Sequence, residues 1–212
     1  MHVTVALDRP VDGAEDSAKR RQIVEGARAV FLAQGFDAAS MADIAREASV
    51  SKGTLYVYFK NKEELFAEIV KLECASHAEG AFQLDPNDHD VERVLTQLGI
   101  NFVGFLCTME KAASLRIVIA IAERKPEIGK VFYETGPAFG IARLRSYLEA
   151  QVKAGILTIE DCGIVASQFL DSCQSTLFKP VLFKFGAPPS ADEVRRVVTI
   201  AVRAFLAAYR AK

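Results

Sequence analysis

Apolar residues are spaced along most of this chain as they are on one face of a helix. Between residues 17 and 34 they fall three and four apart, at Ile23, Val24, Ala27 and Phe31, and Gly35 follows as a helix stop. Comparable patterns cover residues 40–48, 51–59, 62–82, 90–107, 111–123, 126–155, 158–185 and 190–210. No segment alternates as a β-strand does. The pattern predicts an all-α protein of about nine helices.

Polar residues that commonly cap helices stand at the predicted starts: Ser40, Ser51, Asn61 and Ser190. Ser190 is followed three residues later by Glu193, which completes a capping box. Gly136 and Pro137 interrupt the helical pattern over residues 126–155. Pro180 lies inside the pattern at 158–185, and we expect it to kink that helix.

Two domains are predicted, with the boundary inside the helix that begins at Lys62, where a block of basic residues ends. Residues 1–16 have no periodicity and are predicted to form a disordered arm. Two short helices within residues 40–59, joined at Ser49 and Val50, follow the first helix, so residues 17–62 are predicted to be a small helix-turn-helix domain. Residues 63–212 then form an antiparallel helical bundle.

Charge is distributed unevenly, although the formal net charge is only −1. Residues 17–62 hold eight Lys or Arg side chains against four Asp or Glu, whereas residues 1–16 hold one against four. A basic block in a slightly acidic chain indicates a surface that binds a polyanion.

Several other classes of protein are disfavoured. The longest strongly apolar run, residues 117–122, is far too short to span a membrane, and no signal peptide is visible, so we expect a cytoplasmic protein. Cys74, Cys107, Cys162 and Cys173 show no paired spacing and are predicted to be free thiols. The three histidines have no metal-ligand spacing, and no catalytic motif is present. We therefore predict no metal site, no cofactor and no catalytic residue.

The N-terminal part contains the run Ala27-x3-Phe31-x3-Gly35-Phe36-x3-Ser40-Met41-x2-Ile44-Ala45-x2-Ala48-x-Val50-Ser51-Lys52-Gly53-Thr54-Leu55-Tyr56-x-Tyr58-Phe59-x2-Lys62-Glu63-x-Leu65. This run gives the chain a resemblance to the TetR family of transcriptional regulators. It covers roughly residues 18–66 and is more specific than a bare helix-turn-helix pattern. The stretch from Glu123 to Ile128 and the helices after it look, more loosely, like the AefR/AcrR-like subgroup.

The resemblance implies a DNA-binding surface around the third helix. Thr54 and Tyr56 are the expected base contacts, and Gly53 lets the backbone approach DNA closely. Tyr58, Lys60 and Lys62 lie where the family contacts phosphate, and Ser40 is expected to hold another phosphate with its hydroxyl or the helix N-terminus. The full expected set is Ser40, Ser51, Lys52, Gly53, Thr54, Tyr56, Tyr58, Lys60 and Lys62. Val57 departs from the tyrosine or histidine common at its position in the family, which puts one polar contact in doubt.

The bundle is expected to bind an effector and a second copy of the chain. An apolar or aromatic effector would lie among side chains from several helices: Phe102, Phe105, Leu106, Leu115, Ile119, Phe132, Phe139, Phe169 and Cys173. A dimer interface would use the last two long helices: Ile164, Gln168, Asp171, Phe178, Val197, Ile200, Ala201, Ala204, Phe205 and Ala208. Each of these residues has the alternative of serving the subunit's own core.

These observations predict a homodimeric repressor that binds double-stranded DNA at a palindromic operator and is released by a small hydrophobic or aromatic effector. Two alternatives stay open. One is a non-specific, architectural DNA-binding protein. Such a protein would not need the bundle of about 145 residues that follows the small DNA-binding domain. The other is an enzyme built on the bundle.

Overall fold

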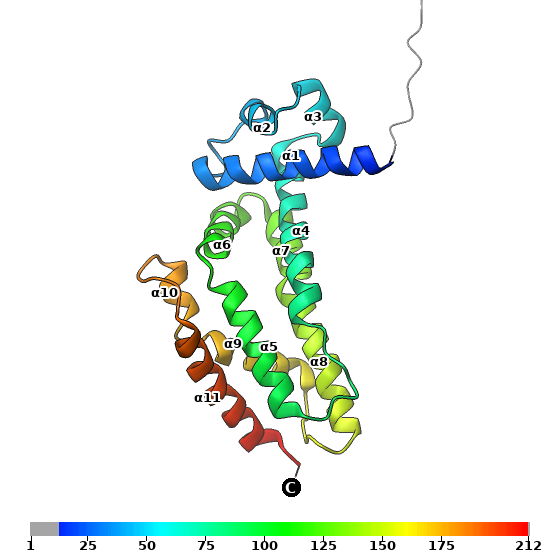
Figure 1. Cartoon of the computed structure of the whole chain (residues 1–212), viewed down its shortest axis with the longest axis vertical. Coiled ribbons are helices and arrows are strands. Elements are labelled where there is room, and N and C mark those ends of the chain that lie inside the picture. Colours follow the sequence, from blue (N-terminus) through cyan, green and yellow to red (C-terminus); the bar gives the residue numbers. More distant parts are fainter. Residues whose placement is uncertain (1–12, 212) are drawn as a thin grey trace, which may run out of the picture. The chain divides into compact units, whose positions relative to one another are not determined.

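The computed structural model describes residues 13–211, apart from the side chains of residues 13–15 and 74–81. The described residues form eleven helices: α1 (Gly13–Gln34), α2 (Met41–Glu47), α3 (Lys52–Tyr58), α4 (Lys62–Ala81), α5 (Val91–Leu106), α6 (Met109–Ala122), α7 (Pro126–Thr135), α8 (Pro137–Lys153), α9 (Cys162–Gln174), α10 (Phe178–Leu182) and α11 (Ala191–Tyr209) (Figure 1). Over this range the only β-type pairing is an isolated antiparallel bridge between Leu157 and Arg210. The predicted all-α class is confirmed.

The chain divides into two compact units, Met1–Ile69 and Val70–Lys212. The division falls within α4, which begins in the first unit and ends in the second. Each unit has its own apolar interior. None of the described helices is long and apolar enough to cross a membrane.

An aromatic cluster fills the interior of the first unit. Phe31 stacks on Phe36 with ring centroids 5.5 Å apart, and Phe66 meets both rings edge-on at 5.2 and 5.4 Å. Gly26 lets α1 and α2 pack closely, because a Cβ atom there would lie 2.7 Å from Ala48. The start of α4 therefore belongs to the same small core as the helix-turn-helix.

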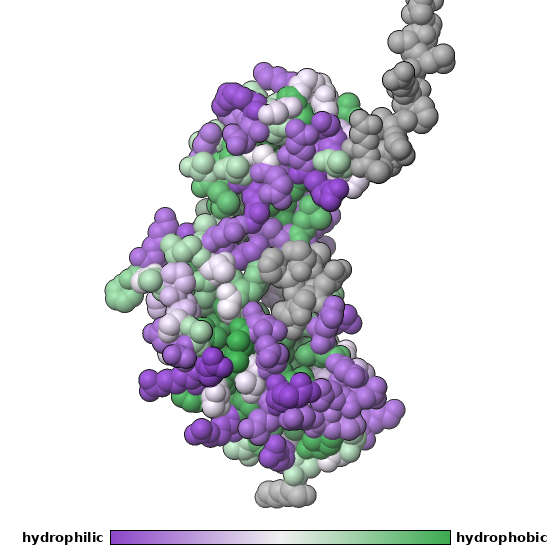
Figure 2. Space-filling model, in the orientation of Figure 1, coloured by the Kyte–Doolittle hydropathy of each residue, from purple (hydrophilic) through white to green (hydrophobic). Residues whose placement is uncertain are grey.

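The second unit is built around α5, α8, α9 and α11. The packed helix pairs include α8 with α9, α11 with both α5 and α9, and α6 with α7. Leu95, Leu144, Leu148 and Val198 are fully buried at the centre of this interior. At the end of α10 the chain turns outward, and Phe183 and Phe185 are 76% and 87% exposed, where Figure 2 shows an apolar spot at the outer edge.

Two predicted boundaries were wrong. Helix α1 begins at Gly13, so the last four residues of the predicted 1–16 arm are helical; residues 1–12 lie outside the described part. The predicted helix over 158–185 is two helices, α9 and α10, separated by a turn at Ser175–Leu177. Pro180 explains the break, because in a continuous helix its ring would clash with the carbonyl of Thr176, whereas in the first turn of α10 its missing N–H needs no partner.

Candidate nucleic-acid interface

Capped helix ends set the geometry of the helix-turn-helix. The hydroxyl of Ser51 accepts a hydrogen bond of 3.0 Å from the backbone N–H of Thr54, and it lies 2.8 Å from the Thr54 hydroxyl. Ser49 takes a left-handed φ of 50° in the turn between α2 and α3, while the N–H of Val50 bonds to the carbonyl of Ala45. The predicted caps at Ser40, Ser51, Asn61 and Ser190 and the turn at Ser49 and Val50 are confirmed.

Ser40 caps α2 and is itself engaged. Its hydroxyl accepts from the N–H of Asp43 at 3.1 Å and donates to the carboxylate of Asp43 at 2.5 Å. This bond, together with one from Arg46, lowers the pKa of Asp43 below its usual value. Because the Ser40 proton goes to Asp43, a phosphate at this helix end would meet backbone N–H groups rather than the hydroxyl.

The face of α3 that looks away from the core carries most of the predicted DNA contacts. Leu55 and Phe59 are buried and fix the helix to the unit. Lys52, Gly53, Tyr56 and Lys60 are exposed, and Thr54 and Tyr58 are half-buried. The structure thus brings seven predicted residues (with Ser51) onto one short segment that is open to solvent.

Lys62 is the exception, and its predicted phosphate contact is corrected. Its ammonium donates to the backbone carbonyls of Phe36, Asp37 and Ala39 at 2.8, 3.1 and 3.2 Å. An ammonium group has three N–H donors, and all three are used inside the unit. Lys62 therefore ties the start of α4 to the loop between α1 and α2.

Comparison with known proteins agrees with this geometry. Residues 23–69 match the bacterial regulatory proteins of the tetR family, and residues 93–211 match the C-terminal domain of the AefR-like transcriptional repressors. The chain belongs to the TetR family. It is a DNA-binding transcriptional regulator, and the relatives found are regulators rather than enzymes.

Individual relatives resemble most of the chain. A TetR-family regulator from Mesorhizobium loti is 29% identical, with a TM-score of 0.85 over 92% of this chain and 98% of that one. The flavonoid-responsive regulator FrrA is also 29% identical, with a TM-score of 0.79 over 92% and 98%. The uncharacterised regulator YhgD of Bacillus subtilis is 29% identical over 65% of this chain and 69% of its own length.

The residues predicted to contact an effector fall into three groups. Phe169 and Cys173 are buried in the packed interior of this TetR-family bundle, where the ring of Phe169 meets that of Phe205 edge-on at 5.5 Å. Ile119 is 58% exposed. The others are half-buried despite their size: Phe102, Phe105, Leu106, Leu115, Phe132 and Phe139.

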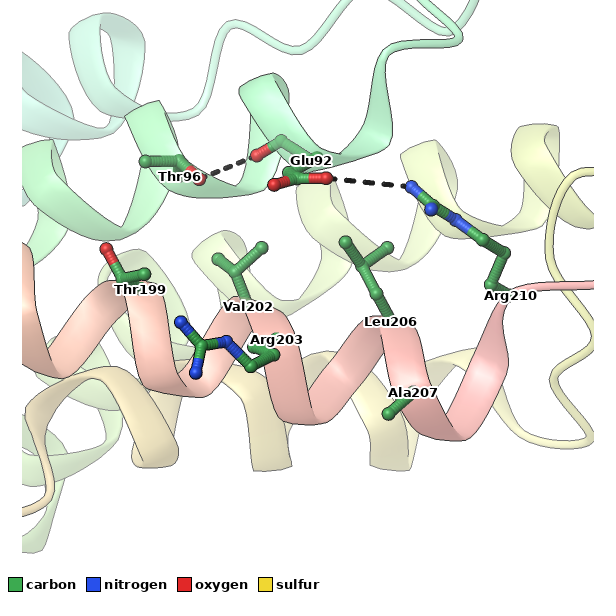
Figure 3. A pocket seen from close by; sticks show the side chains of 8 residues that line it. All are labelled: Glu92, Thr96, Thr199, Val202, Arg203, Leu206, Ala207 and Arg210. Atoms are coloured by element: carbon green, nitrogen blue, oxygen red, sulfur yellow. Dashed lines mark hydrogen bonds and ion pairs between the residues drawn. The ribbon is translucent and has the colours of Figure 1, made fainter.

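Two hollows on the described surface of the bundle lie elsewhere. One is a groove of about 380 Å³ between α5 and α11, in which Glu92 pairs with Arg210 at 3.7 Å above an apolar floor of Val202 and Leu206 (Figure 3). The other, of about 560 Å³, is lined by residues 82–86 and by Arg143, Ser146 and Tyr147 of α8. Neither is lined by a residue of the predicted effector set.

The predicted dimer residues also divide. Ala201 and Phe205 are 6% and 5% exposed, and Phe205 packs on Phe169 and Tyr209, so these two belong to the subunit's own core. The rest leave a different stripe of α9 and α11 uncovered, where Ile164, Gln168, Asp171, Ile200, Ala204 and Ala208 are exposed and Val197 is half-buried. Phe178, which is half-buried, lies on the short helix α10 instead. On α11 the residues of this stripe recur every three or four positions. Such spacing is typical of a helix face that packs against another helix.

The three described cysteines are free, as predicted. Burial raises the pKa of the Cys107 thiol to about 11 and that of Cys173 to about 12. Cys162, at the start of α9, is half-buried, and burial is also the main reason for its raised pKa. The prediction for Cys74 falls on a side chain outside the described part.

Proposed function

We propose that this TetR-family regulator is a homodimeric repressor that binds an inverted-repeat operator and is released by an apolar or aromatic effector. The observation that carries the DNA-binding part is the outward face of α3, where residues suited to DNA lie together on a capped, rigid helix. Lys52 and Lys60 supply charge for phosphates, and Thr54 and Tyr56 supply hydroxyl groups for base edges. We place its action in the cytoplasm, where its DNA partner lies.

The homodimer is supported by the uncovered stripe on α9 and α11. Ile164 and Ile200 are 58% and 57% exposed, and Ala204 and Ala208 leave room for a second helix to approach. Pairing of this stripe with its copy gives a two-fold axis, and a two-fold dimer matches an inverted repeat whose half-sites lie about one DNA turn apart.

The effector site is supported by the six large apolar side chains that stay half-buried on α5, α6, α7 and α8. Small-molecule sites are lined mainly by apolar and aromatic side chains, and these six are partly exposed and therefore open to a ligand. FrrA is described as responsive to flavonoids, which are aromatic compounds, and this favours aromatic effectors for the present chain.

An ion pair offers a path from this region to the DNA-binding unit. Lys111 of α6 lies 3.0 Å from Glu73 of α4, with side chains only 12% and 16% exposed. Its ammonium also lies 5.2 Å from the ring centroid of Phe105, one of the predicted effector residues. Because α4 starts in the DNA-binding unit, an effector that favours one position of α6 would shift the DNA-binding equilibrium through this helix.

The experiment that tests the proposal is selection of duplexes from a random DNA pool with the purified protein. The enriched operator is then titrated with aromatic compounds, flavonoids among them. We expect enrichment of an inverted repeat, which is lost with Tyr56→Ala, and weaker operator binding with at least one compound. Equal binding of all DNA would contradict a sequence-specific regulator, and an operator affinity indifferent to the whole panel would contradict an aromatic effector.

A further inference from the structure

Among the described side chains of the DNA-binding unit, the most exposed large apolar one lies on α3 itself. Val57 is 83% exposed, while Leu55 of the same helix is fully buried. Two residues along an α-helix correspond to a rotation of about 200°, so Val57 lies almost opposite the core. An isopropyl group therefore occupies the middle of the face that meets DNA.

Gly53 lies one turn earlier on the same face and leaves it open. A Cβ atom at Gly53 would meet only the Ser51 hydroxyl, at 3.7 Å, which is ordinary contact. The packing of the unit thus does not require glycine here. The absent side chain leaves space for an outside surface to come close to α3 beside Val57.

The residues around Val57 fit a base edge better than a phosphate. Thr54 and Tyr56 flank it with hydroxyl groups, Lys52 and Lys60 lie at the two ends of the segment, and α3 contains no acidic residue. An isopropyl group has no hydrogen-bond donor for a phosphate oxygen. Among the groups exposed in the major groove, the C5-methyl group of thymine is the apolar one.

We propose that Val57 reads the C5-methyl group of one thymine in each operator half-site, and that Gly53 gives α3 the depth needed for that contact. This inference rests on the proposed function, because it names the base that the α3 face selects. It also replaces the polar contact expected at this position in the family by an apolar one.

The test replaces thymine by deoxyuridine, one position at a time, in the selected operator. Deoxyuridine keeps base pairing and removes only the methyl group. Burial of a group of this size corresponds to about a fourfold change in affinity per half-site, and to about fifteenfold when both half-sites are changed. We expect one thymine per half-site at which the substitution weakens binding of the unchanged protein by these factors.

Variants identify the side chain responsible. Val57→Ala should weaken binding to the thymine operator by a similar factor and be insensitive to deoxyuridine at that position. Val57→Thr keeps one methyl group and should keep the sensitivity, as should Thr54→Ala, which changes a neighbouring contact. Gly53→Ala should lose operator binding while its unfolding midpoint is no lower than that of the unchanged protein, because alanine is favoured over glycine in a helix.

The results distinguish a failure of the methyl contact from a failure of the proposed function. The methyl contact is wrong if Val57→Ala loses as much affinity as the unchanged protein when deoxyuridine replaces thymine at each position. It is also wrong if Val57→Ala weakens binding to random DNA as much as binding to the operator. The proposed regulator function remains in both cases. If the random pool yields no enriched sequence, the proposed function and this inference fall together.

Discussion

The ammonium group of Lys62 donates a hydrogen bond of 2.8 Å to the backbone carbonyl of Phe36 and lies 4.7 Å from the centroid of that residue's ring. One side chain at the start of α4 thus holds the loop that follows α1. Lys62→Met should destabilise the DNA-binding unit by roughly 1.5–3 kcal/mol, because three carbonyl groups lose a charged donor. Urea unfolding of the two proteins measures this change.

Lys60 is the matched control, since it is exposed and lies two residues earlier. Lys60→Ala should leave the unfolding free energy almost unchanged and lower the salt dependence of operator binding by about one unit per subunit. The opposite pattern, with Lys62→Met changing only the salt dependence, would restore Lys62 to the phosphate-binding set.

Thr54 and Tyr56 should determine sequence preference. Thr54→Ala or Tyr56→Phe removes a hydroxyl group from the α3 face, and each should cost about 1–3 kcal/mol of operator binding at one base position. Binding to random DNA should change little, because phosphate contacts supply most of it. Competition between operator and random duplexes measures the difference, and equal losses on both would refute the assignment.

Substitutions of Phe132 and Phe169 should have different effects, because the first residue belongs to the proposed effector region and the second to the packed core. Phe132 is half-buried, so Phe132→Ala should fold, bind operator normally and respond to an effector with about tenfold lower affinity. Phe169 is 3% exposed, and Phe169→Ala should instead lower the unfolding free energy by about 3–5 kcal/mol. Operator release curves and thermal unfolding distinguish the two outcomes; an unchanged release curve for Phe132→Ala would remove that residue from the site.

Two exposed alanines of α11 provide a paired test of the dimer. Ala204→Glu places a charge in the open stripe and should give monomers at micromolar concentration in light scattering. Ala207→Glu makes the same change about 60° away around the axis, next to the α5 groove, and should leave the dimer intact. Dimers of both variants at this concentration would exclude the stripe as the interface.

The buried thiols should not react with alkylating reagents in the native protein. With pKa values of about 11 and 12, Cys107 and Cys173 are only about 0.1% thiolate or less at pH 8, and the thiolate is the reactive form. Alkylation at pH 8 should therefore label neither residue until urea unfolds the bundle. Rapid native labelling of Cys173, followed by mass spectrometry, would show that the interior opens.

Much of the local structure could be predicted because its signals are local. Ser51 is followed three residues later by the N–H that it caps, and Ser190 meets Glu193 in the same way. Pro180 signalled a disruption, but the break lies at Ser175–Leu177, because the proline ring acts on the carbonyl four residues before it.

The errors concern contacts between segments distant in the sequence. The carbonyl groups that bind Lys62 come from a loop more than twenty residues earlier, and no sequence pattern marks them. Helix α11 carries two apolar stripes, and periodicity alone does not say which one faces the subunit's own core. Phe205 faces the subunit's own core, whereas Ala204 is exposed. The exposure of Val57 likewise became visible only with the helix in place.

The most direct measurement of the central claim compares the affinity of the protein for three duplexes built from the selected operator: the inverted repeat, a single half-site, and a direct repeat with the same spacing. Fluorescence anisotropy gives all three affinities at one salt concentration. A two-fold dimer that reads DNA through α3 should bind the inverted repeat at least a hundredfold more tightly than the other two, because only that duplex satisfies both reading helices. Equal affinity for the direct repeat or the half-site would contradict a symmetric dimer that places two copies of α3 on DNA.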